Sequence, residues 1–473
     1  MNIDNNPESE NQRYKWLVMT VVALTTIMCT LDASIVNIAL PVIRAEFHVG
    51  ITIVEWVVIS YLLIITSSLM IFGRLADIAG RKLIFIIGIV IFTAGSMLCA
   101  LAGDIYTLIF FRVFQGIGAA CITANGSAII TEVFPAKQRG KALGMVGTTV
   151  AIGLSSGPVL GGIITDYFGW RYIFLFNLPI GVAALITAQK ILRKSVRNQT
   201  VKFDFAGSAL LTLILGIFLL GWAQWERWGV RTAGILSAVS IVMMVIFVKV
   251  ENRSPFPAID LRLFRDNRFT YANLAAFFNF AARFSVVFLF PFYLIDVRSF
   301  KVSTAGLMMT PVPLLMAVLA LFAGALSDKI GTRYLTASGM LLITISLGML
   351  AFVDPYTSIV YILTSLTISG IGCGLFGAPN TSTIMGSVPR RHLGIAGGMI
   401  SLVRNLGMII GVAWSGAMFA AMKGHGAEGV HEVDKIVPAF QACMKIAVVI
   451  AMLGVIASFK RGEMIRDTDN GLF

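Results

Sequence analysis

Charged residues are scarce in this sequence, and their scarcity argues against most soluble proteins. Asp, Glu, Lys and Arg make up 13% of the 473 residues, about half of the ~25% found in an average globular domain. Hydrophobic residues make up 57%, and the mean hydropathy is +0.85. This balance indicates a membrane protein rather than a water-soluble enzyme.

The groups that enzymes use are also few. The five cysteines stand singly in apolar runs without a CxxC pair, and the four histidines fall in predicted loops at no metal-ligand spacing. The sequence has no GxxxxGK[ST] phosphate loop, because Gly140-Lys141 is followed by Ala142. We therefore expect no metal or other cofactor, no ATP site and no enzymatic activity.

Long apolar runs are what the sequence does contain. A helix needs ~20 mostly apolar residues to cross ~30 Å of hydrocarbon, and runs of that size recur from Trp16 to Phe459. We predict an all-α multi-pass membrane protein with fourteen transmembrane helices, over residues 16–40, 53–72, 83–103, 106–130, 141–164, 172–190, 205–224, 232–249, 269–294, 303–326, 334–353, 357–379, 394–420 and 437–459.

The basic residues predict the orientation of these helices. With the N-terminus in the cytoplasm, 25 of the 37 Lys and Arg residues fall in inner segments, 8 in outer loops and 4 within helices. Cytoplasmic loops of membrane proteins carry such an excess. We therefore predict that both termini are cytoplasmic, and we interpret the net charge of +13 as a topology signal and not as a nucleic-acid-binding surface.

An internal repeat divides the chain. GRLADIAGRK at 73–82 returns 251 residues later as GALSDKIGTR at 324–333, and GIG at 116–118 returns 254 residues later at 370–372. Each charged motif joins the second and third helices of its set on one membrane side, so the repeats are parallel six-helix bundles. The predicted division is an N-terminal tail (1–15), a first bundle (16–195), two inserted helices (196–255), a second bundle (256–459) and a C-terminal tail (460–473).

Several motifs resemble those of the major facilitator superfamily. GRLADIAGRK (73–82) is similar to its cytoplasmic loop signature. LDASIVNIALP (31–41), FFRVFQGIGAA (110–120) and GLSSGPVLGG (153–162) resemble motifs of its fourteen-helix drug:proton antiporters, the EmrB/QacA type. The resemblance implies the major facilitator fold and proton-coupled efflux of hydrophobic or cationic compounds by alternating access, in the cell membrane, with antibiotic resistance as an outcome.

Asp32 is the only acidic residue deep in a predicted span, because Glu55 and Glu132 lie near helix ends. A charge at bilayer depth costs at least about 2.5–3.5 kcal/mol, so a functional role is the default hypothesis. Arg112 lies at a similar predicted depth, counted at ~1.5 Å per residue. The family motif favours proton coupling by Asp32 with Arg112 as its partner. The alternative is a structural ion pair.

The repeated cytoplasmic loop resembles a mechanical element of the family. Its acidic residue can accept hydrogen bonds from arginine and from a helix N-terminus, and would thereby latch the cytoplasmic side. Glycines let the turn approach its neighbours closely. The latch residues are Gly73, Arg74, Asp77, Gly80 and Arg81, with Asp328 in the weaker second copy.

The fifth helix carries a stripe of small residues. Gly153, Gly157 and Gly161 recur every four residues on one face, and Pro158 bends the helix. Such stripes permit close contact between helices in lipid. The spacing alone fits ordinary packing as well as gating, and only the resemblance favours a pivot for the antiporter.

The ninth predicted helix is rich in aromatic residues, and the resemblance places it on the substrate cavity. Its rings would receive apolar or cationic aromatic compounds. Some family members carry a second deep acid in the C-terminal half, whereas the spans here carry Arg283, Arg404 and Lys445 instead. Roles for Arg404 and Lys445 are not predicted. The candidate cavity residues are Asn279, Phe280, Arg283 and Phe284.

Two alternatives to multidrug efflux remain. One keeps the fold and exports an endogenous metabolite, peptide or lipid-like molecule. The other is a non-transporting sensor or scaffold, which the short predicted tails of about 15 residues disfavour because they offer no soluble output domain. The expected partners are small substrates, protons and the lipid bilayer, without nucleic acid, and we expect the protein to work as a monomer.

Overall fold

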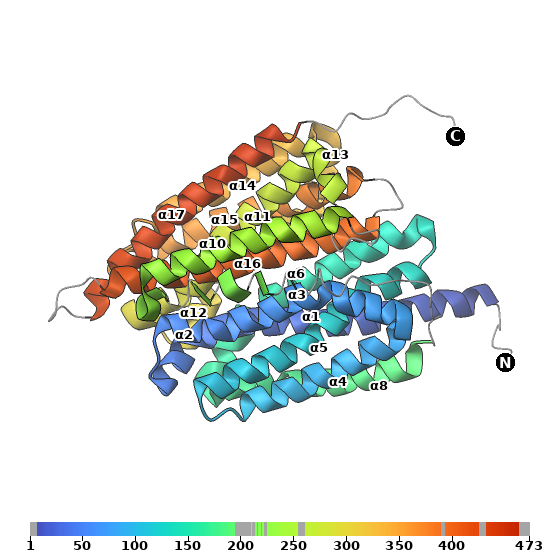
Figure 1. Cartoon of the computed structure of the whole chain (residues 1–473), viewed down its shortest axis with the longest axis horizontal. Helices are drawn as coiled ribbons and strands as arrows, with labels where there is room; N and C mark the ends of the chain where they lie inside the picture. The colour runs from blue at the N-terminus through green and yellow to red at the C-terminus, as the bar shows by residue number, and fades with distance from the viewer. Residues whose placement is uncertain are drawn as a thin grey trace.

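The computed structural model describes residues 7–193, 225–253, 261–388, 393–424 and 432–462, with isolated positions between 210 and 221. All regular structure in these ranges is helical (Figure 1). The elements are α1 (Pro7–Phe47), α2 (Ile51–Val54), α3 (Trp56–Ala79), α4 (Arg81–Ala100), α5 (Ile105–Val133), α6 (Ala136–Phe168), α7 (Arg171–Leu175), α8 (Asn177–Ile191), α10 (Trp225–Arg253), η1 (Leu261–Arg265), α11 (Asn267–Phe292), η2 (Tyr293–Val297), α12 (Val302–Met308), α13 (Pro311–Ile330), α14 (Thr332–Leu350), α15 (Ile359–Gly386), α16 (Leu393–Gly424) and α17 (Glu432–Lys460).

Twelve stretches of the described chain are helical, long and apolar enough to cross a membrane, six within α1–α8 and six within α11–α17. The prediction of an all-helical membrane protein is confirmed, but the predicted count of fourteen is not supported. The predicted helix over 205–224 lies largely outside the described residues. The predicted helix over 232–249 falls in α10, where the apolar part, Gly234–Val250, is shorter than these spans and follows a kink at Gly229.

The spans alternate in direction, so that α1 begins and α17 ends on the same side of the molecule (Figure 1). We call this side the terminal side. The opposite side, which holds the connections 48–50, 101–104, 298–301 and 351–358, is called the distal side. We call α1–α8 the N-terminal half and α11–α17 the C-terminal half.

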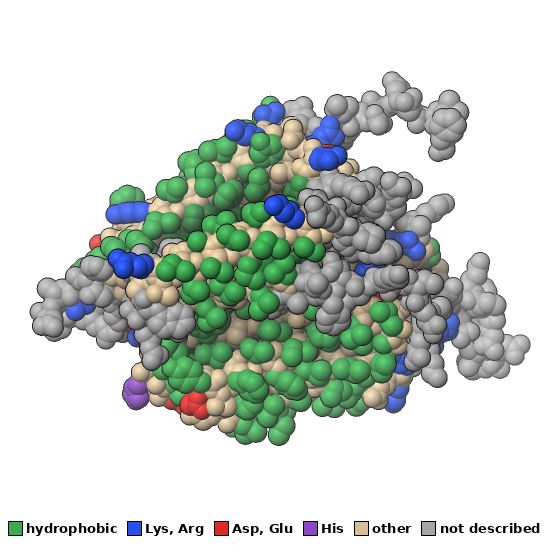
Figure 2. All heavy atoms as spheres, viewed as in Figure 1, with side chains coloured by type: hydrophobic (Ala, Val, Ile, Leu, Met, Phe, Trp, Pro, Cys, Tyr) green, Lys and Arg blue, Asp and Glu red, His purple; other side chains and the backbone are tan. Residues whose placement is uncertain are grey.

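The outer surface is apolar between the two sides. Hydrophobic side chains cover the face seen in Figure 2, and Lys and Arg side chains gather toward its ends. Phe110, Phe322 and Val360 are 67%, 65% and 74% exposed. Large apolar side chains exposed in this way fit a lipid environment, because a soluble monomer rarely exposes large contiguous apolar patches.

The two halves repeat the same close helix contacts. Gly118 of α5 packs on the α4 backbone at Gly88, and Gly372 of α15 packs on the α14 backbone at Gly339. These glycines are separated by the same 251 and 254 residues as the sequence motifs. Glycine allows the backbones to approach in each pair. The packing therefore confirms the internal repeat.

Polar caps define the start of two helices that carry candidate site residues. At the start of α5, Asp104 Oδ1 accepts hydrogen bonds of 2.9 Å from the backbone N–H groups of Tyr106 and Thr107. At the start of α11, Asp266 accepts one of 2.7 Å from the N–H of Arg268. The hydrogen bonds from the Thr107 side chain and backbone lower the pKa of the Asp104 carboxyl, which keeps this cap ionised at neutral pH.

Candidate functional site

A buried ion pair lies inside the N-terminal half. Asp32 Oδ2 accepts a hydrogen bond of 2.5 Å from Nη1 of Arg112 on α5. Its Oδ1 accepts from Gln115 at 2.9 Å and from Asn177 of α8 at 2.8 Å. None of these four side chains is more than 1% exposed. Both carboxylate oxygens are therefore bonded, which offsets much of the free energy lost when a charge leaves water.

The guanidinium of Arg112 is also held by its surroundings. Nε donates to the carbonyl of Val57 at 2.9 Å, and Nη1 donates to Oε1 of Gln115 at 2.6 Å. The Cζ atom lies 4.0 Å from the ring centre of Tyr61 and 5.7 Å from that of Phe174. Rings at this distance stabilise a cation. The structure thus brings together the two residues that were paired from the sequence.

Three polar residues complete the network and were not predicted. Ser96 Oγ accepts hydrogen bonds from Gln115 at 2.6 Å and from Asn177 at 3.3 Å. Gln115 follows Arg112 by three residues in one helix, so its spacing could have indicated a shared face. Asn177 lies 145 positions after Asp32, and only the fold brings the two together.

A second carboxyl group is buried where the two halves meet on the distal side. Glu55 stands between α2 and α3 and is 0% exposed. A methyl group at Gly416 of α16 would overlap Glu55 Oε2, and it would lie 3.4 Å from the ring of Phe288 on α11. Glu55 therefore reaches from the N-terminal half onto the C-terminal half.

The predicted latch loop lies on the terminal side. Asp77 Oδ1 accepts from Nη2 of Arg81 at 3.1 Å, and Arg81 also reaches Glu132 of α5 at 3.4 Å. The turn at Gly80 has φ +104°, and its repeat at Gly331 has φ +87°, a conformation that favours glycine. These ion pairs join helices of the same half and do not bridge the two halves.

The remaining latch residues lie close to this loop or in its copy. A Cβ atom at Gly73 would lie 4.0 Å from Ala124 of α5, so this turn of α3 runs close to α5. Arg74 is half-buried. Asp328 belongs to α13, and its side chain is outside the described part of the chain.

The glycine stripe of α6 faces α1. Methyl groups at Gly153 and Gly157 would overlap the side chains of Thr30 and Ser34, and a methyl group at Gly161 would lie 2.7 Å from the Ile35 carbonyl. Ser34 Oγ also donates to the carbonyl of Gly153 at 3.2 Å. The stripe therefore allows close packing between two helices of the N-terminal half.

Another face of α6 meets the C-terminal half. The carbonyl of Pro158 lies directly against Gly306 of α12, and a Cβ atom at Gly162 would lie 2.7 Å from the carbonyl of Val302. Pro158 was predicted as a pivot residue. Gly162 and Gly306 were not predicted, although Gly162 ends the GLSSGPVLGG motif. One helix thus packs on α1 and contacts the other half.

Polar contacts between the halves also lie on the distal side. Arg44 of α1 forms a salt bridge of 2.9 Å with Asp296 of η2. Ser303 of α12 donates a hydrogen bond of 2.6 Å to Asp166 of α6. Together with the α6–α12 contact, these bonds hold the two halves together at the distal side.

The four predicted cavity residues all lie on α11, but most of them pack inside the C-terminal half. Asn279 is 1% exposed and donates to the sulfur of Met340 at 3.1 Å. Phe280 and Phe284 lie against glycines of α16. Arg283 is half-buried, with Cζ 6.0 Å from the Phe280 ring centre. Arg283 is therefore the best placed of the four for a role beyond packing.

Other ionisable residues of the spans add no cofactor site. Arg404 of α16 is half-buried, with Nε 3.5 Å from Oδ1 of Asn405. Lys445 is exposed on α17. Among the residues that the structure describes, no three His, Cys, Asp or Glu side chains gather as metal ligands would.

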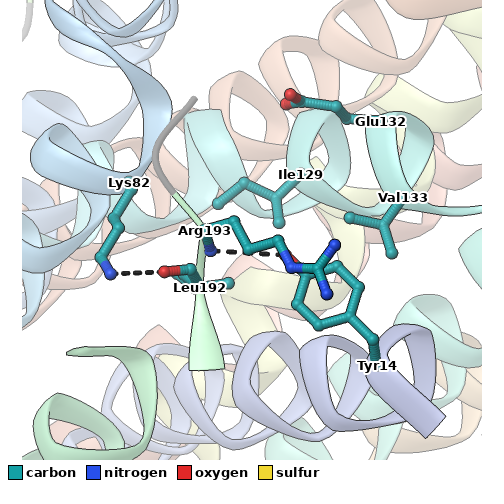
Figure 3. Close-up of a pocket in the computed structure, with 7 residues that line it drawn as sticks. All are labelled: Tyr14, Lys82, Ile129, Glu132, Val133, Leu192 and Arg193. Atoms are coloured by element: carbon teal, nitrogen blue, oxygen red, sulfur yellow. Dashed lines mark hydrogen bonds between the residues drawn. The ribbon is translucent and has the colours of Figure 1, made fainter. Parts of the chain in front are cut away.

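A small pocket on the terminal side lies within the N-terminal half (Figure 3). Lys82 donates to the carbonyl of Leu192 and, at 2.9 Å, to that of Gln189. The backbone N–H of Arg193 donates to the hydroxyl of Tyr14 at 3.3 Å, and its guanidinium lies 4.3 Å from that ring. These contacts tie the end of α8 to α1 and α4, which gives the pocket a structural role.

Comparison with known proteins follows the division into halves. The sequence profile described as Major Facilitator Superfamily matches residues 22–202 and again 203–412. These matches cover far more than half of the chain. The chain belongs to the Major Facilitator Superfamily.

Several curated superfamily members are similar along most of the chain. The riboflavin transporter RibZ of Clostridioides difficile is 35% identical over 97% of this chain and 100% of its own length. The multidrug resistance protein Stp of Mycobacterium tuberculosis is 34% identical over 86% of this chain and 76% of its own length. The multidrug transporter protein MdtP of Bacillus subtilis is 30% identical over 90% and 78%. These relatives are transporters and not enzymes.

Solved structures share the fold at low identity. A bacterial homologue of the human lysosomal transporter Spinster, in an inward-facing and unoccupied conformation, matches with a TM-score of 0.69 at 17% identity, over 95% of this chain and 97% of that one. The partially occluded, inward-open xylose transporter XylE of E. coli matches with a TM-score of 0.62 at 14% identity, over 92% and 97%. The predicted major facilitator fold is thereby confirmed.

Proposed function

We propose that this superfamily member is a proton-coupled exporter of hydrophobic or cationic compounds, working as a monomer, whose activity gives resistance to antibiotics. The relatives named as multidrug proteins support export of such compounds. The buried Asp32 network carries the proposal of proton coupling. A proton on Asp32 would remove its charge and weaken its bonds to Arg112 and Asn177, so the packing of α1 on α5 and α8 would depend on protonation.

The contacts of α6 support a route from this network to the contact between the halves. A shift of α1 would move the Gly153–Gly161 face that packs on it, and α6 carries Pro158 and Gly162 against α12 on another side. Close-packed helices transmit such shifts because their interfaces do not deform continuously. Protonation of Asp32 would thereby bias the distal contacts toward opening or closing.

We further propose that both termini are cytoplasmic, that the region 205–249 adds two spans to the twelve, and that the distal side faces outward. The bias of 25 inner against 8 outer basic residues supports this orientation. The structure, with its halves joined at the distal side, would then correspond to an inward-facing state.

Labelling of single cysteines tests this topology. In a background without the five native cysteines, a membrane-impermeant maleimide added to intact cells should label Leu101→Cys, which is 67% exposed on the distal side, and Arg227→Cys between the two added spans. It should not label Tyr334→Cys, which is 56% exposed on the terminal side. Labelling of Tyr334→Cys alone would reverse the orientation, and protection of Arg227→Cys would remove the two added spans.

A second candidate function is export of an endogenous metabolite. The observation that favours it is the similarity to a riboflavin transporter, which extends over 97% of this chain. A planar, polar aromatic compound of that kind differs from a lipophilic cation mainly in the hydrogen bonds and charge that it requires of its site.

Growth protection separates the two candidates. In a host without its own efflux pumps, expression of the chain should raise the tolerated concentration of several chemically unrelated cations and dyes, and Asp32→Asn at equal expression should abolish the protection. Protection against none of them, together with transport of flavin by the same cells, would favour the metabolite exporter.

A further inference from the structure

Glu55 occupies an unusual position for an acidic residue. It stands at the short break between α2 and α3, with helical backbone angles of φ −59° and ψ −27°, and its side chain is 0% exposed. Unlike Asp32, which is bonded to residues of its own half, Glu55 is covered by helices of the other half. Its surroundings therefore depend on whether the halves are in contact on the distal side.

The C-terminal half covers this carboxyl with an apolar surface. Gly416 of α16 has no side chain and leaves the space that Oε2 occupies, and the ring of Phe288 on α11 lies beside it. No charged side chain occurs in the facing stretches 284–292 of α11 and 408–422 of α16.

Nearby charged groups on the other packed elements have been assigned partners. Arg44 of α1 and Asp296 of η2 form the salt bridge of 2.9 Å between the halves. Glu46 of α1 accepts from Arg171 at 2.5 Å within the N-terminal half. His48, in the turn before α2, is exposed and is the group whose titration must be separated from that of Glu55.

Separation of the halves would change the protonation of Glu55. When α16 and α11 move away from α3, water reaches the carboxyl, and water stabilises its ionised form. When they close again, the apolar surface replaces that water and disfavours the charge. The neutral form of a carboxyl thus favours the closed distal side, and the ionised form favours the open one.

We propose that Glu55 is a second proton-binding site, separate from Asp32, and that proton binding there closes the distal side of the transporter. The inference rests on the proposed alternating access of the two halves. Its ligand is a proton taken up from the distal side, since the residue is reached by water only when that side opens. Acid on the distal side would thereby bias the transporter toward the conformation described above.

Distances between spin labels test this proposal in purified protein. The label pair Leu101→Cys and Tyr356→Cys reports the distal side, and Leu83→Cys with Tyr334→Cys reports the terminal side; all four positions are exposed. Between pH 5 and pH 9 the ratio of long to short distal distances should rise by up to about tenfold per pH unit, the limit for one linked proton.

Variants assign this response to Glu55. Glu55→Gln is nearly isosteric and permanently neutral, so it should keep short distal distances at every pH. Gly416→Ala places a methyl group where the carboxyl lies, so it should give long distances even at pH 5. Glu46→Gln and His48→Asn, on the same side, should respond to pH as the unmodified sequence does.

The outcomes also separate this proposal from proton coupling at Asp32. Asp32→Asn should keep the distal pH response while losing transport driven by a pH gradient. If Glu55→Gln responds to pH as the unmodified protein does, or if only His48→Asn abolishes the response, the proposal is wrong. Loss of the response in Asp32→Asn but not in Glu55→Gln would also overturn it, and would leave the proposed transport mechanism intact.

Discussion

Asp32 and Arg112 depend on each other more than on any surrounding residue. A buried ion pair contributes little compared with an apolar pair of the same shape, but the removal of one member leaves an uncompensated charge inside the protein. Gln115 and Asn177 reduce that penalty because they donate to the same carboxylate oxygen. The network can therefore lose or gain one proton only with a rearrangement of its hydrogen bonds.

A double-mutant cycle measures this dependence. Arg112→Gln should lower the free energy of unfolding in detergent by about 3–5 kcal/mol. The double variant Asp32→Asn/Arg112→Gln should recover part of that loss, with a coupling of about 0.5–3 kcal/mol, because both charges are then absent. Strictly additive losses would show that the two residues do not act as a pair.

At this scale the sequence predicted charges better than amides. Asp32 and Arg112 stand out because a charge in an apolar span is rare and needs a partner, and their depths follow from counting helix residues. Asn177 and Ser96 are ordinary polar residues of apolar helices, so nothing in their own segments connects them with Asp32. The burial of Glu55 depends on α16, which follows it by more than 330 positions.

At the scale of elements, α6 explains how small residues serve two purposes. The Gly153–Gly161 face holds α6 on α1 inside one half, while Pro158 and Gly162 meet Gly306 of the other half. The i, i+4 spacing could predict the first contact, because a helix places such residues on one face. The second contact could not be predicted, since the partner helix α12 comes from the second repeat.

Gly306→Val tests the contact between α6 and α12. Two additional methyl groups and a Cβ atom would meet the Pro158 carbonyl, and overpacking of this kind costs about 1–3 kcal/mol, so the closed distal population should fall roughly tenfold or more. Cross-linking of Asp166→Cys with Ser303→Cys by a short bifunctional thiol reagent should slow accordingly. Gly348→Val on α14 is the matched control, because a Cβ atom there meets nothing within 4 Å; equal cross-linking in both variants would refute the role of Gly306.

At the scale of the whole molecule, the two halves and their shared fold follow from the repeat. The offsets of 251 and 254 residues reappear in the glycine contacts of α4–α5 and α14–α15. The number of spans was harder to predict, because the region between the halves carries no motif and its apolar helix is short. Contact between the halves on the distal side could not be read from the sequence, which is compatible with either conformation.

Asp77→Asn tests the latch, which acts on the molecule as a whole. The ion pair with Arg81 is a charged hydrogen bond worth about 1.5–3 kcal/mol, so turnover should fall about tenfold while the affinity for substrate stays unchanged. Turnover is measured by efflux from proteoliposomes and affinity by equilibrium binding. Glu132→Gln, which touches the same arginine at 3.4 Å, should have the smaller effect. A variant that loses affinity and keeps its turnover would rule out a latch.

Proton coupling through Asp32 is the central claim, and transport by Asp32→Asn tests it most directly. The substitution removes the titratable group at nearly constant volume and keeps one carbonyl oxygen for Gln115 and Asn177. In liposomes with an imposed pH gradient and a fluorescent cation as cargo, the unmodified protein should concentrate the cargo, whereas Asp32→Asn should only equilibrate it down its own gradient. Accumulation by Asp32→Asn in response to the pH gradient would contradict the claim and place the coupled proton elsewhere.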